Sequence, residues 1–184
     1  MSRRLIFFSL ISLSILIGVT SCSSSIPNRN PVGDDFPSVV GESLEKEEVR
    51  LPESVSGEVA ILLVGYEQSV QFDIDRWLLG LLQAGVEARI YELPTISGLV
   101  PTMFSGWIDD GMRSGIPQED WGVVVTFYGD AADPIAALTG TENGRNARVL
   151  VLDQQGKIVW FADQGYSVRL ALELNAVVAQ LNAQ

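Results

Sequence analysis

Few side chains in this sequence of 184 residues could carry out chemistry. The chain contains no histidine, and Cys22 is its only cysteine. The missing histidine excludes a Ser-His-Asp triad, an imidazole base and a histidine metal ligand. A lone cysteine also excludes an intrachain disulfide, a cysteine zinc cluster and a two-cysteine redox pair. The chemistry left to the chain is that of its carboxylates and of Cys22 itself.

Asp109, Asp110, Asp130 and Asp133 are the carboxylates that could gather at one end of a sheet. Oxygen ligands of this kind suit a hard cation, and a cation-dependent hydrolase is the enzymatic alternative that they leave open. Their spacing does not match a calcium-binding loop, and solvated positions at helix ends explain the same residues without a ligand. We therefore expect no catalytic residue, no metal site and no cofactor, and we interpret the protein as a non-enzyme.

The overall charge narrows the range of partners. The chain holds 12 lysine and arginine residues against 23 aspartate and glutamate residues, which gives a formal net charge of -11. A surface with this excess of negative charge does not neutralise phosphate groups. Nucleic acid is therefore not expected as a partner.

Residues 1–21 have the features of a secretory signal peptide. Arg3 and Arg4 precede a mostly apolar run that is shorter than the roughly 20 residues a spanning helix needs. The run ends in the motif VTSC, whose last residue is Cys22, and this motif resembles the lipobox of bacterial lipoproteins. That resemblance implies cleavage before Cys22, a diacylglycerol on its sulfur and often a further acyl chain, such as palmitate, on the new amino group.

The expected location is extracytoplasmic, with the protein anchored to the cell membrane through lipid at Cys22. Ser23 stands where some double-membraned bacteria use aspartate to retain lipoproteins on the inner membrane. An outer membrane is therefore possible if the source has one. The alternative is an ordinary secretory peptide cleaved near Ser21, which would leave Cys22 as a free thiol.

Residues 22–56 are predicted to be a disordered acidic tether that begins at the lipid-bearing cysteine. The segment is rich in serine, proline, asparagine, glycine and acidic residues. Four prolines interrupt any regular element, and little apolar periodicity is visible. A short surface helix over 42–50 is the alternative that the sequence leaves open.

Residues 57–184 are predicted to form one α/β domain. The continuous apolar run at 59–64 indicates a strand buried on both faces, and the stripe at Val70, Ile74 and Trp77 indicates a following helix. Further strands are expected over 87–93, 123–128, 148–152 and 157–161, and helices over 70–82, 103–112, 133–138 and from 167 onward. This order implies a parallel sheet with helices on both faces and an antiparallel hairpin at one edge.

This order of elements resembles the thioredoxin-like fold in its redoxin form. The most specific stretch is VLVLDQQGKIVW at residues 149–160, which is similar to the closing hairpin of that family. The resemblance covers about residues 57–182 and implies a central mixed five-stranded sheet with helices on both faces. Residues 105–117 (SGWIDDGMRSGIP), 126–128 (TFY) and Asp130 are similar to a cysteine-free branch that includes the mitochondrial ATP-synthase assembly factor.

Two departures from the redoxin pattern decide the expected activity. Redoxins place a nucleophilic cysteine at the start of the first helix, where the helix terminus lowers its pKa. That place here reads YEQS at residues 66–69. Redoxins also place a cis-proline before the strand that begins here at Arg148, and the residues before it read GRNA at 144–147. We therefore expect neither thiol-disulfide exchange nor thiol peroxidase activity.

The resemblance to the assembly-factor branch implies a partner-binding site. Its residues would be Asp110, Met112, Arg113, Tyr128 and Asp130. Arg113 lies in the last turn of a predicted helix, where a cation suits the helix dipole. The alternative interpretation is that Arg113 pairs with Asp110 or Asp130 and shapes a rim on which a protein docks.

The aromatic residues divide into two groups. Trp77 and Trp107 lie in apolar helical stripes, and we expect both in the core. Trp121 and Tyr128 flank the third predicted strand and are expected to be partly exposed. An exposed aromatic ring beside Arg113 would suit a protein-binding surface.

Taken together, these features predict a membrane-anchored, non-redox thioredoxin-like lipoprotein of the cell envelope. Its expected function is to bind a protein partner at the membrane as an assembly or folding factor. The cation-dependent hydrolase and a purely structural envelope lipoprotein remain the alternatives.

Overall fold

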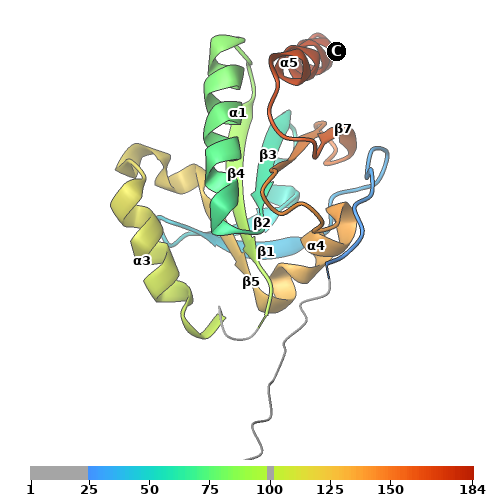
Figure 1. The fold of residues 1–184 in the computed structure, drawn as a ribbon. Coiled ribbons are helices and arrows are strands. Elements are labelled where there is room, and N and C mark those ends of the chain that lie inside the picture. Colours follow the sequence, from blue (N-terminus) through green and yellow to red (C-terminus); the bar gives the residue numbers. More distant parts are fainter. Residues whose placement is uncertain (1–24, 99–101) are drawn as a thin grey trace, which may run out of the picture.

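A computed structural model describes residues 25–98 and 102–184. Cys22 and the predicted signal peptide lie outside the described residues. The described chain forms a seven-stranded mixed sheet in the order β2-β1-β5-β4-β3-β6-β7, with helices against both of its faces (Figure 1). All five predicted strands are present. The prediction of five strands is nevertheless too low, because two further strands precede them in the chain.

For the elements that the sequence predicts, the observed bounds agree with the predicted ones to within a few residues. The strands are β1 (Val39–Ser43), β2 (Glu48–Leu51), β3 (Ala60–Gly65), β4 (Arg89–Ile96), β5 (Val125–Tyr128), β6 (Arg148–Leu152) and β7 (Ile158–Ala162). The helices are α1 (Gln71–Gln83), α3 (Ser105–Gly115), α4 (Asp133–Thr139) and α5 (Val168–Asn182). In the described part of the chain, no helix is both long enough and apolar enough to span a membrane.

Strand β3 lies near the centre of the sheet, and all of its residues are buried. It runs parallel to β4 and antiparallel to β6. Successive side chains of a strand point to opposite faces, so β3 contributes to two cores. Ile61 packs on one face with Trp77 of α1 and Leu174 of α5. Leu62 packs on the other face in a cluster that includes Ile135 of α4.

The closing hairpin is the one that the sequence predicts. Strands β6 and β7 pair antiparallel, and β7 forms one edge of the sheet. Gly156 in the connecting turn has a φ of 82°, a conformation that glycine adopts without strain. The sheet therefore combines the expected parallel centre with the expected antiparallel edge.

The predicted disordered tether is wrong for residues 25–56, which are folded, and the alternative helix over 42–50 is also absent. Strands β1 and β2 form an antiparallel hairpin, and β1 pairs with β5 at the other edge of the sheet. Phe36, Leu44 and Leu51 are each at most 3% exposed. These apolar residues stand far apart among acidic residues and prolines, so they show no clear period. Each one nevertheless reaches the core. An edge hairpin buries only one of its sides, so its buried positions are isolated in the sequence.

We expect Leu51→Ala to lower the free energy of unfolding by about 2–5 kcal/mol, because a fully buried leucine leaves a cavity when truncated. Val40→Ala, on the exposed side of β1, is the matched control and should change it by less than about 0.5 kcal/mol. Urea unfolding of the two variants measures both values. Equal, small effects would mean that residues 39–51 are not part of the folded domain.

Candidate functional site

Helix α3 carries most of the residues that the sequence assigns to a partner site, and polar contacts fasten it to the sheet. The Tyr128 hydroxyl of β5 donates to Asp109 Oδ1 at 2.7 Å. Arg113 donates to the carbonyl of Leu44 at 2.7 Å and pairs with Asp110 at 2.8 Å. Asp109 is the one buried residue of the helix. The inner side of α3 is therefore charged and hydrogen-bonded, where a covering helix is usually apolar.

Arg113 pairs with Asp110, which is one of the two partners that the sequence allows. Its guanidinium also lies 6.0 Å from the centre of the Trp121 ring, and its side chain is only 12% exposed. Trp121 and Tyr128 are half-buried, as expected. Asp130, the other allowed partner, is exposed and makes no ion pair with any described residue. Arg113 thus has a structural role at the end of α3, because it links the helix to the segment after β1.

The largest apolar side chain of α3, that of Trp107, faces outward, and the expectation that Trp107 belongs to the core is wrong. Met103 and Trp107 are each 79% exposed, and Phe104 is 57% exposed. Trp77, predicted from a similar stripe, is fully buried as expected. The two stripes look alike in sequence, but β5 presents polar side chains such as Thr126 toward α3. Met112, the remaining residue of the predicted site, is half-buried.

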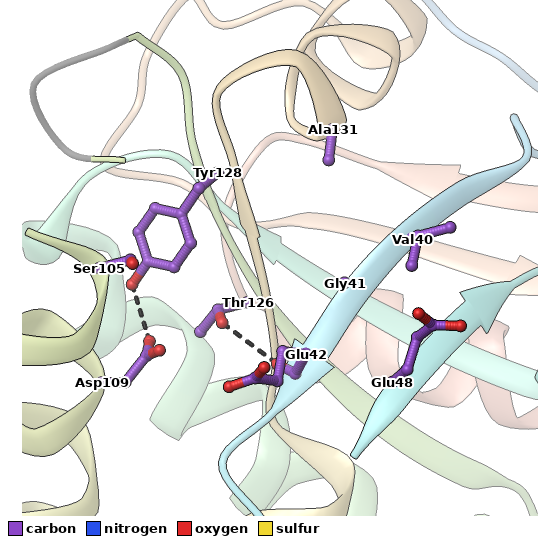
Figure 2. Close-up of a pocket in the computed structure, with 9 residues that line it drawn as sticks. All are labelled: Val40, Gly41, Glu42, Glu48, Ser105, Asp109, Thr126, Tyr128 and Ala131. Carbon is purple, nitrogen blue, oxygen red and sulfur yellow. Dashed lines mark hydrogen bonds between the residues drawn. The ribbon is translucent and has the colours of Figure 1, made fainter. Parts of the chain in front are cut away.

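A pocket of about 350 Å³ lies between α3, β5 and the β1–β2 hairpin (Figure 2). Its lining residues are Val40, Gly41, Glu42, Glu48, Ser105, Asp109, Thr126, Tyr128 and Ala131. Burial and the hydrogen bond to Asp109 raise the pKa of Tyr128 above its usual range. The phenol therefore stays protonated and donates to the Asp109 carboxylate at neutral pH. Sequence reasoning missed Glu42 and Glu48 because it assigned them to the tether.

The four aspartates considered for a hydrolase do not form a metal site. Asp109 is buried, whereas Asp110, Asp130 and Asp133 are exposed. Within residues 25–98 and 102–184, no group of three or more Cys, Asp or Glu side chains could hold a metal ion. The arrangement of these carboxylates therefore does not support the cation-dependent hydrolase.

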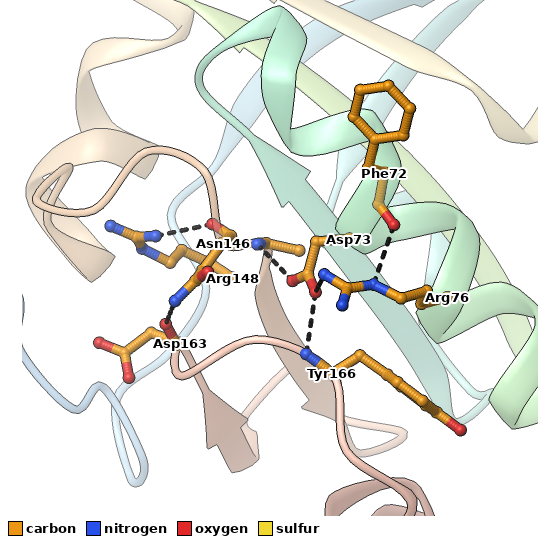
Figure 3. Close-up of polar contacts among 8 residues, drawn as sticks. Phe72, Asp73, Arg76, Asn146, Arg148, Asp163 and Tyr166 are labelled. Carbon is orange, nitrogen blue, oxygen red and sulfur yellow. Dashed lines mark hydrogen bonds and ion pairs between the residues drawn. The ribbon is translucent and has the colours of Figure 1, made fainter.

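The start of α1, where redoxins carry their nucleophile, is part of an internal polar clamp (Figure 3). Asp73 in the first turn of α1 is 1% exposed. Its carboxylate accepts hydrogen bonds from the backbone N–H of Ala147 at 3.0 Å and of Tyr166 at 2.9 Å. Arg76 adds an ion pair at 2.9 Å. One carboxylate thus joins α1 to the segment before β6 and to the segment before α5.

Arg148, at the start of β6, lies next to the place where redoxins have their cis-proline, and it is fully buried. It donates to the carbonyls of Glu142, Asn143 and Asn146 and to the side-chain oxygen of Asn28. Figure 3 shows it beside Asn146. Burial lowers its pKa from the ordinary value. The guanidinium therefore fixes the loop before β6 and the N-terminal segment, and its bonds are all internal.

The ring of Tyr66 closes this region from the end of β3. The Arg148 guanidinium lies 5.6 Å from the centre of that ring. The Tyr66 hydroxyl donates to the carbonyl of Ile135 at 3.0 Å and lies 2.7 Å from the Thr139 hydroxyl. Burial raises the pKa of Tyr66 to about 12. Tyr66 and Arg148 thus form hydrogen bonds to other parts of the domain and a cation–π contact with each other, which gives both a structural role.

Both Asp73 and Arg148 carried a signal that the sequence reasoning did not use. Asp73 lies on the apolar stripe of α1, three residues after Val70 and four before Trp77. Arg148 opens a strand whose other residues are all apolar and buried. A charged residue inside an apolar pattern is rarely buried without partners. Such positions therefore indicate internal polar networks even before a structure is known.

Comparison with known proteins finds similarity in structure alone. No protein-family model matches the chain, and no curated protein matches its sequence. Among solved structures, BsSco, described as a member of the Sco family of cytochrome c oxidase assembly proteins, is 11% identical. The match covers 84% of this chain and 98% of that chain, with a TM-score of 0.57.

Two further solved structures match to a similar extent. A SCO1/SenC family lipoprotein from Bacillus anthracis is 10% identical over 85% of this chain and 99% of its own, with a TM-score of 0.57. Yeast Sco1 with copper bound is 13% identical over 85% of this chain and 96% of its own, with a TM-score of 0.55. Identities this low show the fold alone. The expected thioredoxin-like α/β fold is thereby confirmed, and the sheet has seven strands.

The residues present do not fit a copper site built from imidazole or thiolate ligands. The chain has no histidine, and its single cysteine at position 22 lies outside the described residues. Copper prefers imidazole, thiolate and thioether ligands. The two loops at the places where redoxins have their reactive residues, 66–69 and 144–147, contain none of these side chains.

We expect Arg148→Met to lower the free energy of unfolding by about 3 kcal/mol or more, because several buried oxygen atoms lose their donor. Arg145→Met, an exposed arginine in the same loop, is the matched control and should change it little. Urea unfolding measures both variants. If the two substitutions had equal effects, the assignment of Arg148 as the centre of the network would be wrong.

Glu92 on β4 predicts a pH dependence of stability. Its carboxyl group is 9% exposed, and burial first, then the charge of Asp75, raise its pKa from 4.5 to about 7. Between these two values the folded state holds a proton that the unfolded chain has lost, so stability falls as the pH rises through this window.

We therefore expect Glu92→Gln to be more stable than the parent at about pH 8, by up to about 3 kcal/mol, and similar to it at about pH 4. Urea unfolding at the two pH values tests this. Glu87→Gln, at an exposed position just before β4, is the control for a general charge effect. A gain in Glu92→Gln that is the same at both pH values would contradict the account.

Proposed function

We propose that this protein is a lipid-anchored, non-redox thioredoxin-like domain that binds a protein partner at the membrane. The observation that carries this proposal is the mounting of α3, with Asp109 and Arg113 toward the sheet and Trp107 outside. Trp107 is exposed together with Met103 and Phe104, which directly precede the helix, and these three apolar residues are called here the α3 surface. Exposed aromatic residues of this kind are typical anchors in protein interfaces.

The relatives in fold support an assembly or folding role for the binding. BsSco is described as belonging to a family of cytochrome c oxidase assembly proteins, and the Bacillus anthracis protein is described as a lipoprotein. The region of this chain where redoxins have their reactive residues has internal structural bonds in place of a thiol pair. A binding role at the α3 surface is therefore better supported than a chemical role at the end of the sheet.

The folded N-terminal segment makes the proposed anchor short. The backbone N–H of Ile26 donates to the Thr141 hydroxyl at 2.9 Å, so the chain is fixed to the domain from this residue on. Only three residues separate Ile26 from Cys22. At roughly 3.5 Å for each residue step, a lipid on Cys22 would hold the domain within about 14 Å of the membrane. A partner in or on the same membrane is then within reach.

We expect Cys22→Ala to abolish labelling of the protein by a palmitate analogue and to release it from the membrane fraction. Lipidation at this sulfur is the proposed cause of anchoring, since the two acyl chains of the diacylglycerol supply durable membrane affinity. Ser24→Ala is the matched control and should remain labelled and membrane-bound. Persistent labelling of the Cys22→Ala protein would refute the assignment of the anchor.

We expect the double variant Phe104→Ser, Trp107→Ser to lose a partner that co-purifies in stoichiometric amount with the full-length protein from gently solubilised membranes. A loss of at least about tenfold is the expected effect of removing aromatic anchors. The matched control is Phe72→Ser, Leu82→Ser on α1, where both side chains are 77% exposed.

Retention of the partner by the α3 double variant, or an equal loss in the α1 control, would show that the α3 surface is not the binding site. Arg113→Ala is a less informative test. It would release the Leu44 carbonyl and free the end of α3, so a lost partner could result from local unfolding.

A further inference from the structure

The pocket between α3 and the sheet is lined by a carboxylate, that of Asp109, which forms no ion pair with any described residue. Asp109 is 6% exposed, and its Oδ1 accepts the hydrogen bond from Tyr128. No cation pairs with this carboxylate among the described residues, and its Oδ2 has no donor among them. Oδ2 is not one of the fully buried polar atoms that lack a partner, so it is accessible from the pocket that Asp109 lines. A cationic group that enters the pocket could therefore donate to it.

Neighbouring side chains do not supply this charge. Arg113 lies one turn further along α3, but its guanidinium is engaged by Asp110 and by the Leu44 carbonyl. Arg50 is engaged by Glu48, another lining residue, in an ion pair at 2.6 Å. The remaining lining carboxylate, Glu42, is exposed and belongs to no ion pair in the described part of the chain. The charge of the pocket is thus negative.

The shape of the pocket suits a long side chain better than a single ion. Its volume of about 350 Å³ exceeds what one metal ion fills, and no group of three metal-binding side chains occurs in the described residues. Val40 and Ala131 offer apolar contacts for a methylene stem, and Figure 2 shows the Tyr128 ring on the same side as Asp109. Lysine and arginine combine an apolar stem with a charged end.

We propose that this pocket receives a lysine or arginine side chain of the protein partner, whose charged end pairs with Asp109 and then with Glu42. This inference rests on the proposed function and specifies the chemistry of the partner, which presents a basic residue beside an apolar surface that covers Phe104. The charge complementarity extends beyond the pocket, because the whole chain carries a net charge of -11. Opposite charges at such a contact fix the register of the complex.

The test uses the full-length protein in detergent micelles and three capped tripeptides, in which arginine, lysine or uncharged citrulline stands between two glycines. Backbone amide signals in the NMR spectrum report the binding position. We expect saturable shifts at Gly41 and Thr126 with the arginine and lysine peptides. Binding of the citrulline peptide should be weaker by at least about tenfold.

Asp109→Asn removes the charge but keeps an oxygen that can accept a hydrogen bond from Tyr128. This variant should bind the arginine peptide at least about tenfold more weakly. Asp130→Asn, an exposed aspartate outside the pocket, is the matched control and should bind normally. Glu42→Gln lies on an exposed position and gives a second variant if Asp109→Asn does not fold. This variant should also weaken binding of the arginine peptide.

Four results would overturn the inference. They are equal binding of the citrulline peptide, unchanged binding by folded Asp109→Asn, no binding of any peptide at millimolar concentration, and saturable shifts at the same amides with Mg²⁺ or Ca²⁺ alone. Loss of the partner in the α3 double variant would still stand in each of these cases. The proposed function would then hold with a different occupant of the pocket.

Discussion

The polar attachment of α3 is the constraint on which the rest of the candidate site depends. Asp109 and Arg113 occupy the side of the helix that faces the sheet, where apolar residues would normally lie. Two consequences follow from this single arrangement. The largest apolar side chain of the helix, that of Trp107, is left on the outer side. The gap beneath the helix is lined by hydrogen-bonding and charged groups and remains open as a pocket.

The opposite arrangement holds where redoxins carry out their chemistry. There the charged groups are buried and form hydrogen bonds within the protein, as Asp73 and Arg148 illustrate. Asp73 joins three chain segments through one carboxylate, and Arg148 orders the loop before β6. These bonds stabilise that end of the sheet, where neither a thiol nor a cis-proline is present. The same fold is therefore compatible with the proposed binding on a neighbouring face and with structural bonding at the end where redoxins react, since fold alone does not determine function.

Whether the sequence predicts a part of the fold depends on how the side chains of that part are buried. The strands from 59 onward are predictable because a strand covered on both faces is continuously apolar, as β3 is. The β1–β2 hairpin is not predictable in this way, because an edge hairpin among acidic residues buries only isolated positions such as Leu51. At the site, the Asp110–Arg113 pair follows from helical spacing. The exposure of Trp107 does not follow, because it depends on the polar residues that β5 presents to α3.

The most direct test of the account is photo-crosslinking in intact membranes, with a photoreactive phenylalanine analogue in place of Trp107 and, separately, of Leu82. Both positions are highly exposed, one on α3 and the other on α1. The account predicts one discrete crosslinked protein from position 107 and none from position 82, with the 107 product weakened by Asp109→Asn. The same products from both positions, or none from position 107, would contradict the claim that α3 is the partner-binding element.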